Sequence, residues 1–169
     1  MKRLLQRSVI VLVAFLLSGN AICQTHSSSS AQEKIEAVSK SLVKREIRKI
    51  EIVWMNPHTE TRDAITEKSL DVQYHVRLVK QNIFAGRYED NLIAALRSTI
   101  VKPATDQTDD IDLRWGVKFF DANSNVPVVS LYLNGNGEVG TVDGVDVSFG
   151  GGFYKWLDKN FSNFFLNSH

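Results

Sequence analysis

The sequence has no hydrophobic run long enough to cross a membrane. Its apolar stretch from Val9 to Leu17 has nine residues, whereas a helix that spans a bilayer needs roughly 20. Lysine and arginine precede this stretch, and a short segment of small and polar residues, Ser18 to Cys23, follows it. These three parts in this order are typical of a secretory signal peptide. We therefore predict that residues 1–23 are a signal peptide and that no transmembrane anchor remains after cleavage.

Cysteine is nearly absent. Cys23 is the only one, so a mature chain that begins at Gln24 contains no thiol and forms no disulfide. Small secreted eukaryotic domains often depend on such cross-links, whereas the rest of this chain is long enough to bury a core without them. The sequence therefore favours a bacterial protein that is periplasmic or secreted.

Cys23 also has a second interpretation. A cysteine at the end of a signal sequence can carry the lipid of a bacterial lipoprotein, and the Ser-rich segment from Gln24 to Ser30 would suit the flexible tether of such a protein. The residues before Cys23, Asn20-Ala21-Ile22, fit the lipidation pattern poorly. Simple removal of Cys23 is favoured, and a lipid anchor at Cys23 is the alternative.

An excess of positive charge is also missing. Loss of the first 23 residues leaves a small net negative charge, which argues against nucleic acid as a partner. Acidic residues predominate between Pro103 and His169. Such asymmetry can attract a cationic partner, or it can be a solvated surface.

The common catalytic signatures are absent too. The sequence has no Gly-x-Ser-x-Gly elbow, no Gly-x-x-x-x-Gly-Lys loop and no thiol after signal cleavage, which excludes the usual serine-hydrolase, P-loop and cysteine-nucleophile patterns. Of the four histidines, only His58 and His75 lie away from the predicted mobile ends, which is too few for a zinc site. We expect no catalytic residue, no metal and no cofactor.

One segment imitates a calcium loop. Asp121-x-Asn123-x-Asn125 copies the first ligand positions of an EF-hand, but Val126 stands where that loop requires glycine. Asn, Asp and Gly are also the residues that sharp turns require. The segment is predicted to be a hairpin turn.

Helical and strand spacings alternate after residue 30. The segment 59–69 is predicted to be a loop with a short helical turn near Ile65 to Leu70. Asp143-Gly144 is a two-residue hairpin signal. Apolar spacing predicts helices over 31–45, over 88–101 where Pro103 ends the helix, and from 153 onward, and strands over 47–55, 72–79, 111–119, 126–133, 138–142 and 145–149.

These elements predict one α+β domain over residues 31–169, preceded by a flexible tether at 24–30. Strands joined by tight turns are antiparallel. Each predicted helix has one apolar side that must lie against a sheet. We expect an antiparallel sheet of about five strands with a C-terminal β-meander, packed against three helices in two layers.

Two groups of residues are candidates for a binding surface. Trp54 and Met55 stand at a strand end beside the Asn56-Pro57 turn, where an exposed aromatic residue could contact a ligand. The second group lies on the face of the meander opposite Trp115 and comprises Phe120, Tyr132, Arg114 and Lys118. These residues form a binding patch if that face is exposed to solvent, and they belong to a core if a helix covers it.

The sequence favours a small exported binding protein that recognises another protein in the cell envelope or outside the cell, as an inhibitor, immunity factor or accessory factor does. One alternative is an envelope-acting enzyme of unfamiliar type, in which His75 beside Asp71 or Glu67 would serve as a general base. Another is a glycan-binding module that uses Trp54 and Tyr132. The binding interpretations share one test, since burial of Trp54, Phe120 and Tyr132 together would remove the proposed surface.

Overall fold

The computed structural model of the chain describes residues 30–81, 87–104 and 111–162. The predicted signal peptide, Cys23 and residues 24–29 of the predicted tether lie outside these residues, and Ser30, expected to end the tether, is the first described residue of a helix. Within the described ranges, no helix combines the length and the apolar character that a membrane span requires.

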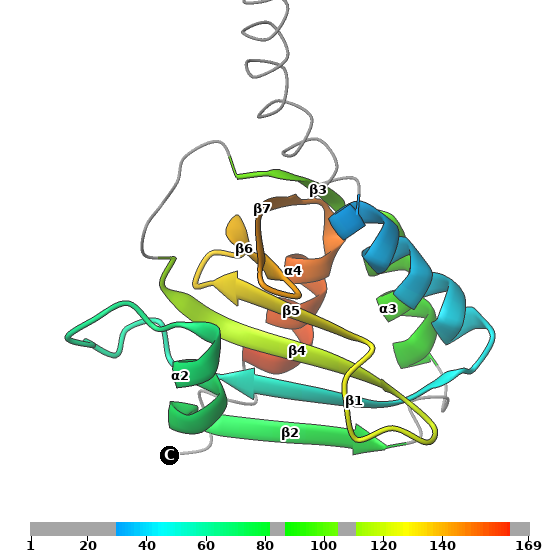
Figure 1. The fold of residues 1–169 in the computed structure, drawn as a ribbon, viewed down its shortest axis with the longest axis horizontal. Coiled ribbons are helices and arrows are strands. Elements are labelled where there is room, and N and C mark those ends of the chain that lie inside the picture. The colour runs from blue at the N-terminus through cyan, green and yellow to red at the C-terminus, as the bar shows by residue number, and fades with distance from the viewer. Residues whose placement is uncertain (1–29, 82–86, 105–110, 163–169) are drawn as a thin grey trace, which may run out of the picture.

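Seven strands form one antiparallel sheet (Figure 1). They lie in the order β2-β1-β4-β5-β6-β7-β3, so β2 and β3 are its edges. The strands β4 to β7 follow one another along the chain as neighbours, which is the predicted C-terminal meander. The bounds are β1 (Ile47–Trp54), β2 (Val76–Gln81), β3 (Ile100–Pro103), β4 (Leu113–Asp121), β5 (Val129–Asn134), β6 (Val139–Val142) and β7 (Val145–Gly150).

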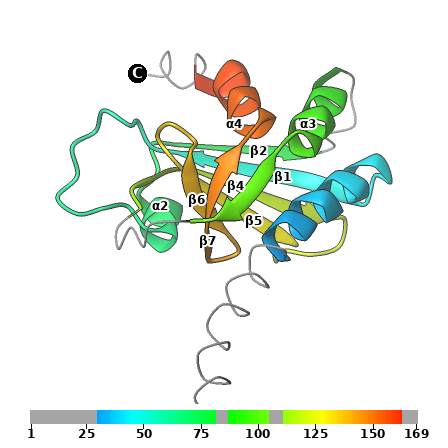
Figure 2. The same ribbon diagram turned by 90° about the horizontal axis from the view of Figure 1, so that it is seen from above.

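Helices cover both faces of the sheet. A helix over residues 30–43, α3 (Arg87–Arg97) and α4 (Gly152–Leu157) contribute to the larger core, and the π-helical segment η1 (Asp158–Ser162) continues α4. The short helix α2 (Glu67–Gln73) lies on the opposite face. Figure 2 shows α3 and α4 on one side of the strands and α2 on the other. The α+β class is confirmed, and α2 adds a partial third layer.

The larger core follows from the period-two alternation of the strands. Every second residue of β1 and β4 turns toward the three helices, and α4 adds the stacked rings of Phe153 and Trp156. The strand residues on this side are Ile50, Ile52, Trp54, Trp115, Val117 and Phe119.

A smaller apolar cluster holds α2. Leu70 is the buried residue of this helix, and the Thr66 hydroxyl accepts the Ser69 amide at 3.2 Å as the N-cap. A helix of seven residues has little stability of its own. The position of α2 therefore depends on its contacts with the sheet, where Leu70 packs with Val53, Met55, Ile65, Leu113 and Tyr132.

The expected count of about five strands was too low, since the sheet has seven, and β3 is the strand that no predicted strand segment covers. The spacing over 88–101 predicted one continuous helix, but α3 ends at Arg97 and the chain then pairs with β7. The side chain of Gln32 accepts the Val101 amide at 2.9 Å. Because these partners come from distant parts of the sequence, local spacing did not reveal the strand.

The strand predicted over 72–79 was wrong at its start. Residues up to Gln73 belong to α2, and β2 begins at Val76. Val72 is 76% exposed on α2, so it does not share a buried strand face with Leu78. The apparent alternation arose from two different elements that adjoin at this point.

The hairpin signal at Asp143-Gly144 was correct. Both residues have positive φ, 49° and 78°, as a type I′ turn requires. Val142 and Val145 are directly paired across the turn, which brings β6 and β7 together beside α2.

Candidate functional site

A row of residues crosses the sheet beneath α2. Strand register makes Cα partners of Val53 and Gly116, Gly116 and Tyr132, Tyr132 and Thr141, and Thr141 and Asp146. Partners in register point to the same face. The row therefore places three polar side chains on the side of the sheet that α2 covers, and it is the centre of the candidate site.

Tyr132 lies in this row as a buried hydrogen-bond donor. Its hydroxyl is 3.0 Å from both carboxylate oxygens of Asp71 on α2. Burial, together with the negative charge of Asp71, raises the pKa of Tyr132 above its usual range. Tyr132 thus stays protonated at neutral pH and serves as a donor rather than as a base.

Gly116 makes room for the Tyr132 ring. A Cβ atom at this position would lie 2.7 Å from a methyl carbon of Val53 and 2.9 Å from Cε1 of Tyr132. Such distances are shorter than carbon atoms tolerate without displacement. The absence of a side chain at Gly116 is therefore what allows Tyr132 to lie across β4.

Four charged side chains near Tyr132 alternate in sign, and we call them the charge ladder: Arg77, Glu51, Lys118 and Asp71. Arg77 pairs with Glu51 at 2.7 Å, and Lys118 pairs with Asp71 at 2.6 Å. Glu51 and Lys118 are Cα partners on β1 and β4. The hydrogen bond with Glu51 also raises the pKa of Arg77 above its already high range.

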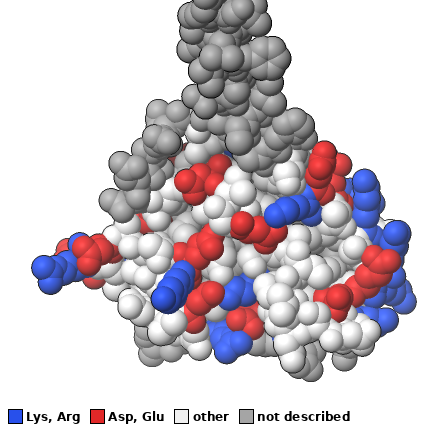
Figure 3. Space-filling model, viewed as in Figure 1, with Lys and Arg blue, Asp and Glu red and all other residues white. Residues whose placement is uncertain are grey.

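The charge ladder connects α2 to the sheet. Figure 3 shows acidic and basic groups intermingled on the face of the molecule that carries α2. Each member has a partner of opposite sign within the chain. The ladder therefore fixes the position of α2 instead of offering unpaired groups to a ligand.

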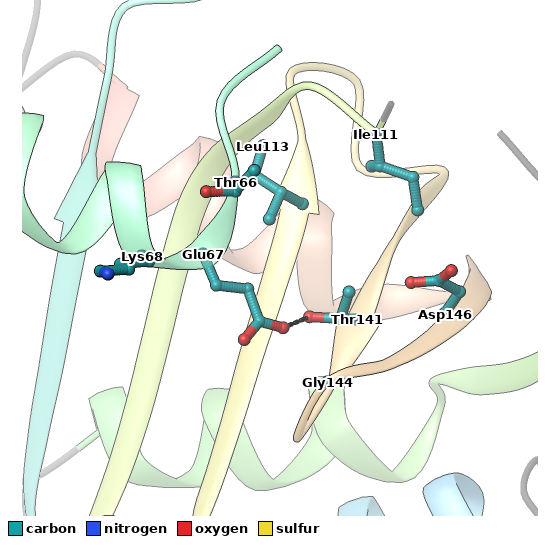
Figure 4. A pocket seen from close by; sticks show the side chains of 8 residues that line it. All are labelled: Thr66, Glu67, Lys68, Ile111, Leu113, Thr141, Gly144 and Asp146. Atoms are coloured by element: carbon teal, nitrogen blue, oxygen red, sulfur yellow. Dashed lines mark hydrogen bonds between the residues drawn. The ribbon is translucent and has the colours of Figure 1, made fainter. Parts of the chain in front are cut away.

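A cavity of about 410 Å³ lies beside the charge ladder, between α2 and the β6–β7 hairpin. Figure 4 shows Glu67 reaching from α2 toward Thr141, whose hydroxyl donates to the Glu67 carboxylate, while Lys68 points away. The cavity is lined by Thr66, Glu67 and Lys68, by Ile111 and Leu113, and by Thr141, Gly144 and Asp146 of the hairpin. It thus combines apolar walls with carboxylates from two elements.

The predicted exposed aromatic patch was wrong. Trp54, Phe120 and Tyr132 are only 3%, 4% and 3% exposed, and Met55 is buried as well. Tyr132 lies under α2, which is the covered alternative considered for this face of the meander. Burial of all three aromatic residues removes that surface.

The other two aromatic residues are covered for different reasons. Trp54 packs in the larger core against Trp115, with ring centroids 6.0 Å apart. The Lys49 ammonium lies 3.6 Å from the centre of the Phe120 ring, a cation–π contact. Trp54 and Tyr132 belong to the cores on opposite faces of the sheet, so they do not form the single platform that the glycan-binding hypothesis needs.

Arg114 is buried and forms hydrogen bonds within the chain. Its Nε and a terminal nitrogen donate to the same Asp112 oxygen at 2.9 and 2.6 Å. The other terminal nitrogen lies within 3.4 Å of the carbonyl oxygens of Asn56 and Thr59. Arg114 therefore connects the segment after β1 to β4 through hydrogen bonds. Lys118 likewise has a partner within the chain, because it forms an ion pair with Asp71.

The suggested pairing of His75 with Asp71 or Glu67 was also wrong. His75 Nδ1 accepts the Asn56 amide at 3.2 Å, and its ring meets Trp54 edge-on. Asp71 instead accepts from Tyr132 and Lys118, and Glu67 accepts from Thr141. The structure thus does not form the general base that the enzyme hypothesis proposed.

The calcium-like segment contains the turn that was expected. Asp121 Oδ1 accepts the Asn123 amide at 2.9 Å, which is a local Asx turn. In the ranges that the structure describes, no group of three or more His, Cys, Asp or Glu side chains is arranged so that it could hold a metal ion.

Sequence reasoning missed the residues that shape the cavity. Glu67 was considered only as a partner of His75, and Thr141 and Asp146 were not singled out. One signal was available, because Thr141 and Asp146 are placed symmetrically about the correctly identified Asp143-Gly144 turn, and a two-residue hairpin pairs such positions. Nothing local indicated that α2 would pack against that pair.

Comparisons with known proteins give no further guidance. The chain matches no protein-family model, no curated protein and no solved structure. The residues of the site are therefore the basis for the function proposed below.

Proposed function

We propose that this chain is a small exported protein that acts by binding another protein in the cell envelope or outside the cell, in the manner of an inhibitor, an immunity factor or an accessory factor. The amino-terminal signal-like segment supports export, although it lies outside the described residues. The observation that supports binding most directly is the cavity between α2 and the β6–β7 hairpin.

The chemistry of this cavity suits an anchor side chain of a partner protein. Such anchors fill pockets that are apolar in part and that carry a few placed polar groups. Ile111 and Leu113 supply the apolar contacts, and Glu67 and Asp146 supply the polar ones. The charge ladder beside the cavity holds one of its walls, α2, in place.

The test is affinity capture with the purified protein from envelope and culture-fluid extracts of the cells that produce it, followed by mass spectrometry. Asp146 is exposed, so Asp146→Trp fills the mouth of the cavity without disturbing the core. Glu36→Trp, on the helix over residues 30–43, is the matched control, because Glu36 is also an exposed carboxylate residue and lies outside the cavity lining.

We expect the wild-type protein and Glu36→Trp to retain one stoichiometric protein that Asp146→Trp loses. Calorimetry with that purified protein should then show saturable binding. If the wild-type protein retains no protein from either extract, the proposed function is wrong. Equal capture by Asp146→Trp would overturn the assignment of the cavity as the binding surface.

A further inference from the structure

Among the residues that the structure describes, the carboxylates of the cavity differ from other acidic groups nearby in having no cationic partner. Asp71, Asp112 and Asp143 form ion pairs with a lysine or arginine of the chain, and so does Glu51. Within the described ranges, neither Glu67 nor Asp146 takes part in such a pair.

Thr141 contacts Glu67 and lies beside Asp146 in the sheet. It donates its hydroxyl to one oxygen of Glu67 from below α2, and it is the Cα partner of Asp146 on the neighbouring strand. Figure 4 shows both carboxylates turned toward the space around Thr141. The Glu67 carboxylate is therefore fixed before a ligand arrives, with its second oxygen still able to accept a hydrogen bond.

The apolar part of the cavity complements this acidic end. Ile111 and Leu113 line the same space as Glu67 and Asp146, and the basic side chain among the lining residues, Lys68, is directed away from it. A long aliphatic stem that ends in a cation satisfies both parts at once, since arginine and lysine bury their methylene groups while their charged ends seek carboxylates.

We propose that the cavity accepts one arginine or lysine side chain of the partner protein, with its stem against Ile111 and Leu113 and its cation between Glu67 and Asp146. This inference rests on the proposed function and adds to it the chemistry of the contact. The cavity volume of about 410 Å³ accommodates one long side chain and part of the backbone that carries it. Thr141 is a positioning residue in this arrangement.

The test is a titration of the isotope-labelled protein, followed by backbone amide NMR, with acetyl-Gly-Arg-Gly-amide and acetyl-Gly-Lys-Gly-amide. A peptide with citrulline in place of arginine is the matched probe, because it keeps the shape and lacks the charge. We expect saturable shifts confined to α2, Leu113 and the β6–β7 hairpin. Binding should be about tenfold or more weaker for citrulline and should weaken with added salt.

Asp146→Asn and Glu67→Gln should each weaken binding of the basic peptide about tenfold. Glu36→Gln is the control, because it removes a carboxylate charge from outside the cavity and should leave binding unchanged. Equal binding of the citrulline peptide, or shifts that spread over the acidic surface without saturation, would overturn the inference. The same shifts with calcium chloride and none with the peptides would reassign the site to a metal cation.

The capture experiment and the peptide titration distinguish failure of the proposed protein binding from failure of the proposed basic side chain. If extracts yield a protein that Asp146→Trp loses while the basic peptides produce no shifts, the inferred basic side chain is wrong and protein binding stands. If the peptides bind in the cavity while capture is blank, protein binding is wrong and the cation site stands.

Discussion

Replacing Tyr132 by phenylalanine tests whether the polar contacts under α2 hold that helix on the sheet. The change keeps the ring that fills the space above Gly116 and removes only the hydroxyl that donates to Asp71. A hydrogen bond to a charged acceptor contributes about 1.5–3 kcal/mol to stability. The Asp71 side chain is 31% exposed, so water replaces part of that contact, and we expect a loss of about 1–2 kcal/mol.

The assay is equilibrium unfolding in urea at pH 7, followed by the fluorescence of the buried tryptophans. The midpoint should fall without a change in the slope, because the surface exposed on unfolding is nearly the same. Tyr154→Phe is a matched control, since the Tyr154 hydroxyl donates to the neutral carbonyl oxygen of Gly135 at 2.7 Å. Its cost should be smaller, about 0.5–1 kcal/mol.

A double-mutant cycle decides whether the cost comes from the pair. In an Asp71→Ala background the hydroxyl has lost its acceptor, so Tyr132→Phe should then cost less than in the wild type, and the coupling energy should be about 0.5–2 kcal/mol. An equal cost in both backgrounds would refute the reasoning, because the effect would then arise from the ring environment and not from Asp71.

Three further predictions concern the same face. The pKa of Tyr132 is raised in the folded chain, so the protonated hydroxyl contributes fully to stability below about pH 10, the pKa of an unfolded tyrosine. This contribution is lost as the pH rises above that value. Urea midpoints measured from pH 9 to 11 should therefore fall less steeply in Tyr132→Phe than in the wild type. Gly116→Ala should lower the free energy of unfolding by about 1–3 kcal/mol, measured in urea, because its new methyl group would overlap Val53; a neutral result would contradict the packing described. Arg114→Gln should speed trypsin cleavage after the exposed Arg62, measured by mass spectrometry, because the segment after β1 loses the bonds that Arg114 of β4 donates to the carbonyl oxygens of Asn56 and Thr59; an unchanged cleavage rate would contradict this role of Arg114.

Much of the fold could be predicted because its signals are local. The alternation over 111–119 placed Trp115 and Lys118 on opposite faces of β4, as the structure has them. The Asp143-Gly144 turn fixed the β6–β7 pairing, because positive φ at both positions is a local property of those two residues.

The site could not be predicted in the same way, because its contacts join residues that are far apart in the sequence. Tyr132 was correctly placed on the face opposite Trp115, but its exposure depended on whether a helix would cover it. Asp71 is 61 residues away from Tyr132 along the chain and 47 from Lys118. No spacing rule connects such positions, so burial of the aromatic residues became visible only in three dimensions.

The charge ladder and the cavity are linked through α2. Glu67, Leu70 and Asp71 are spaced three and four residues apart and so share one face of the helix. Asp71 is held at one end of that face by Lys118 and Tyr132, and Glu67 reaches Thr141 from the other end. Ion pairs, whether exposed or buried, stabilise a fold less than their number suggests, and the members of the ladder are partly exposed, so the main contribution of the ladder is to position α2. If the Asp71 contacts are lost, α2 keeps little besides Leu70 and the Glu67–Thr141 bond to fix its orientation, and the Glu67 carboxylate is less well placed for a ligand in the cavity.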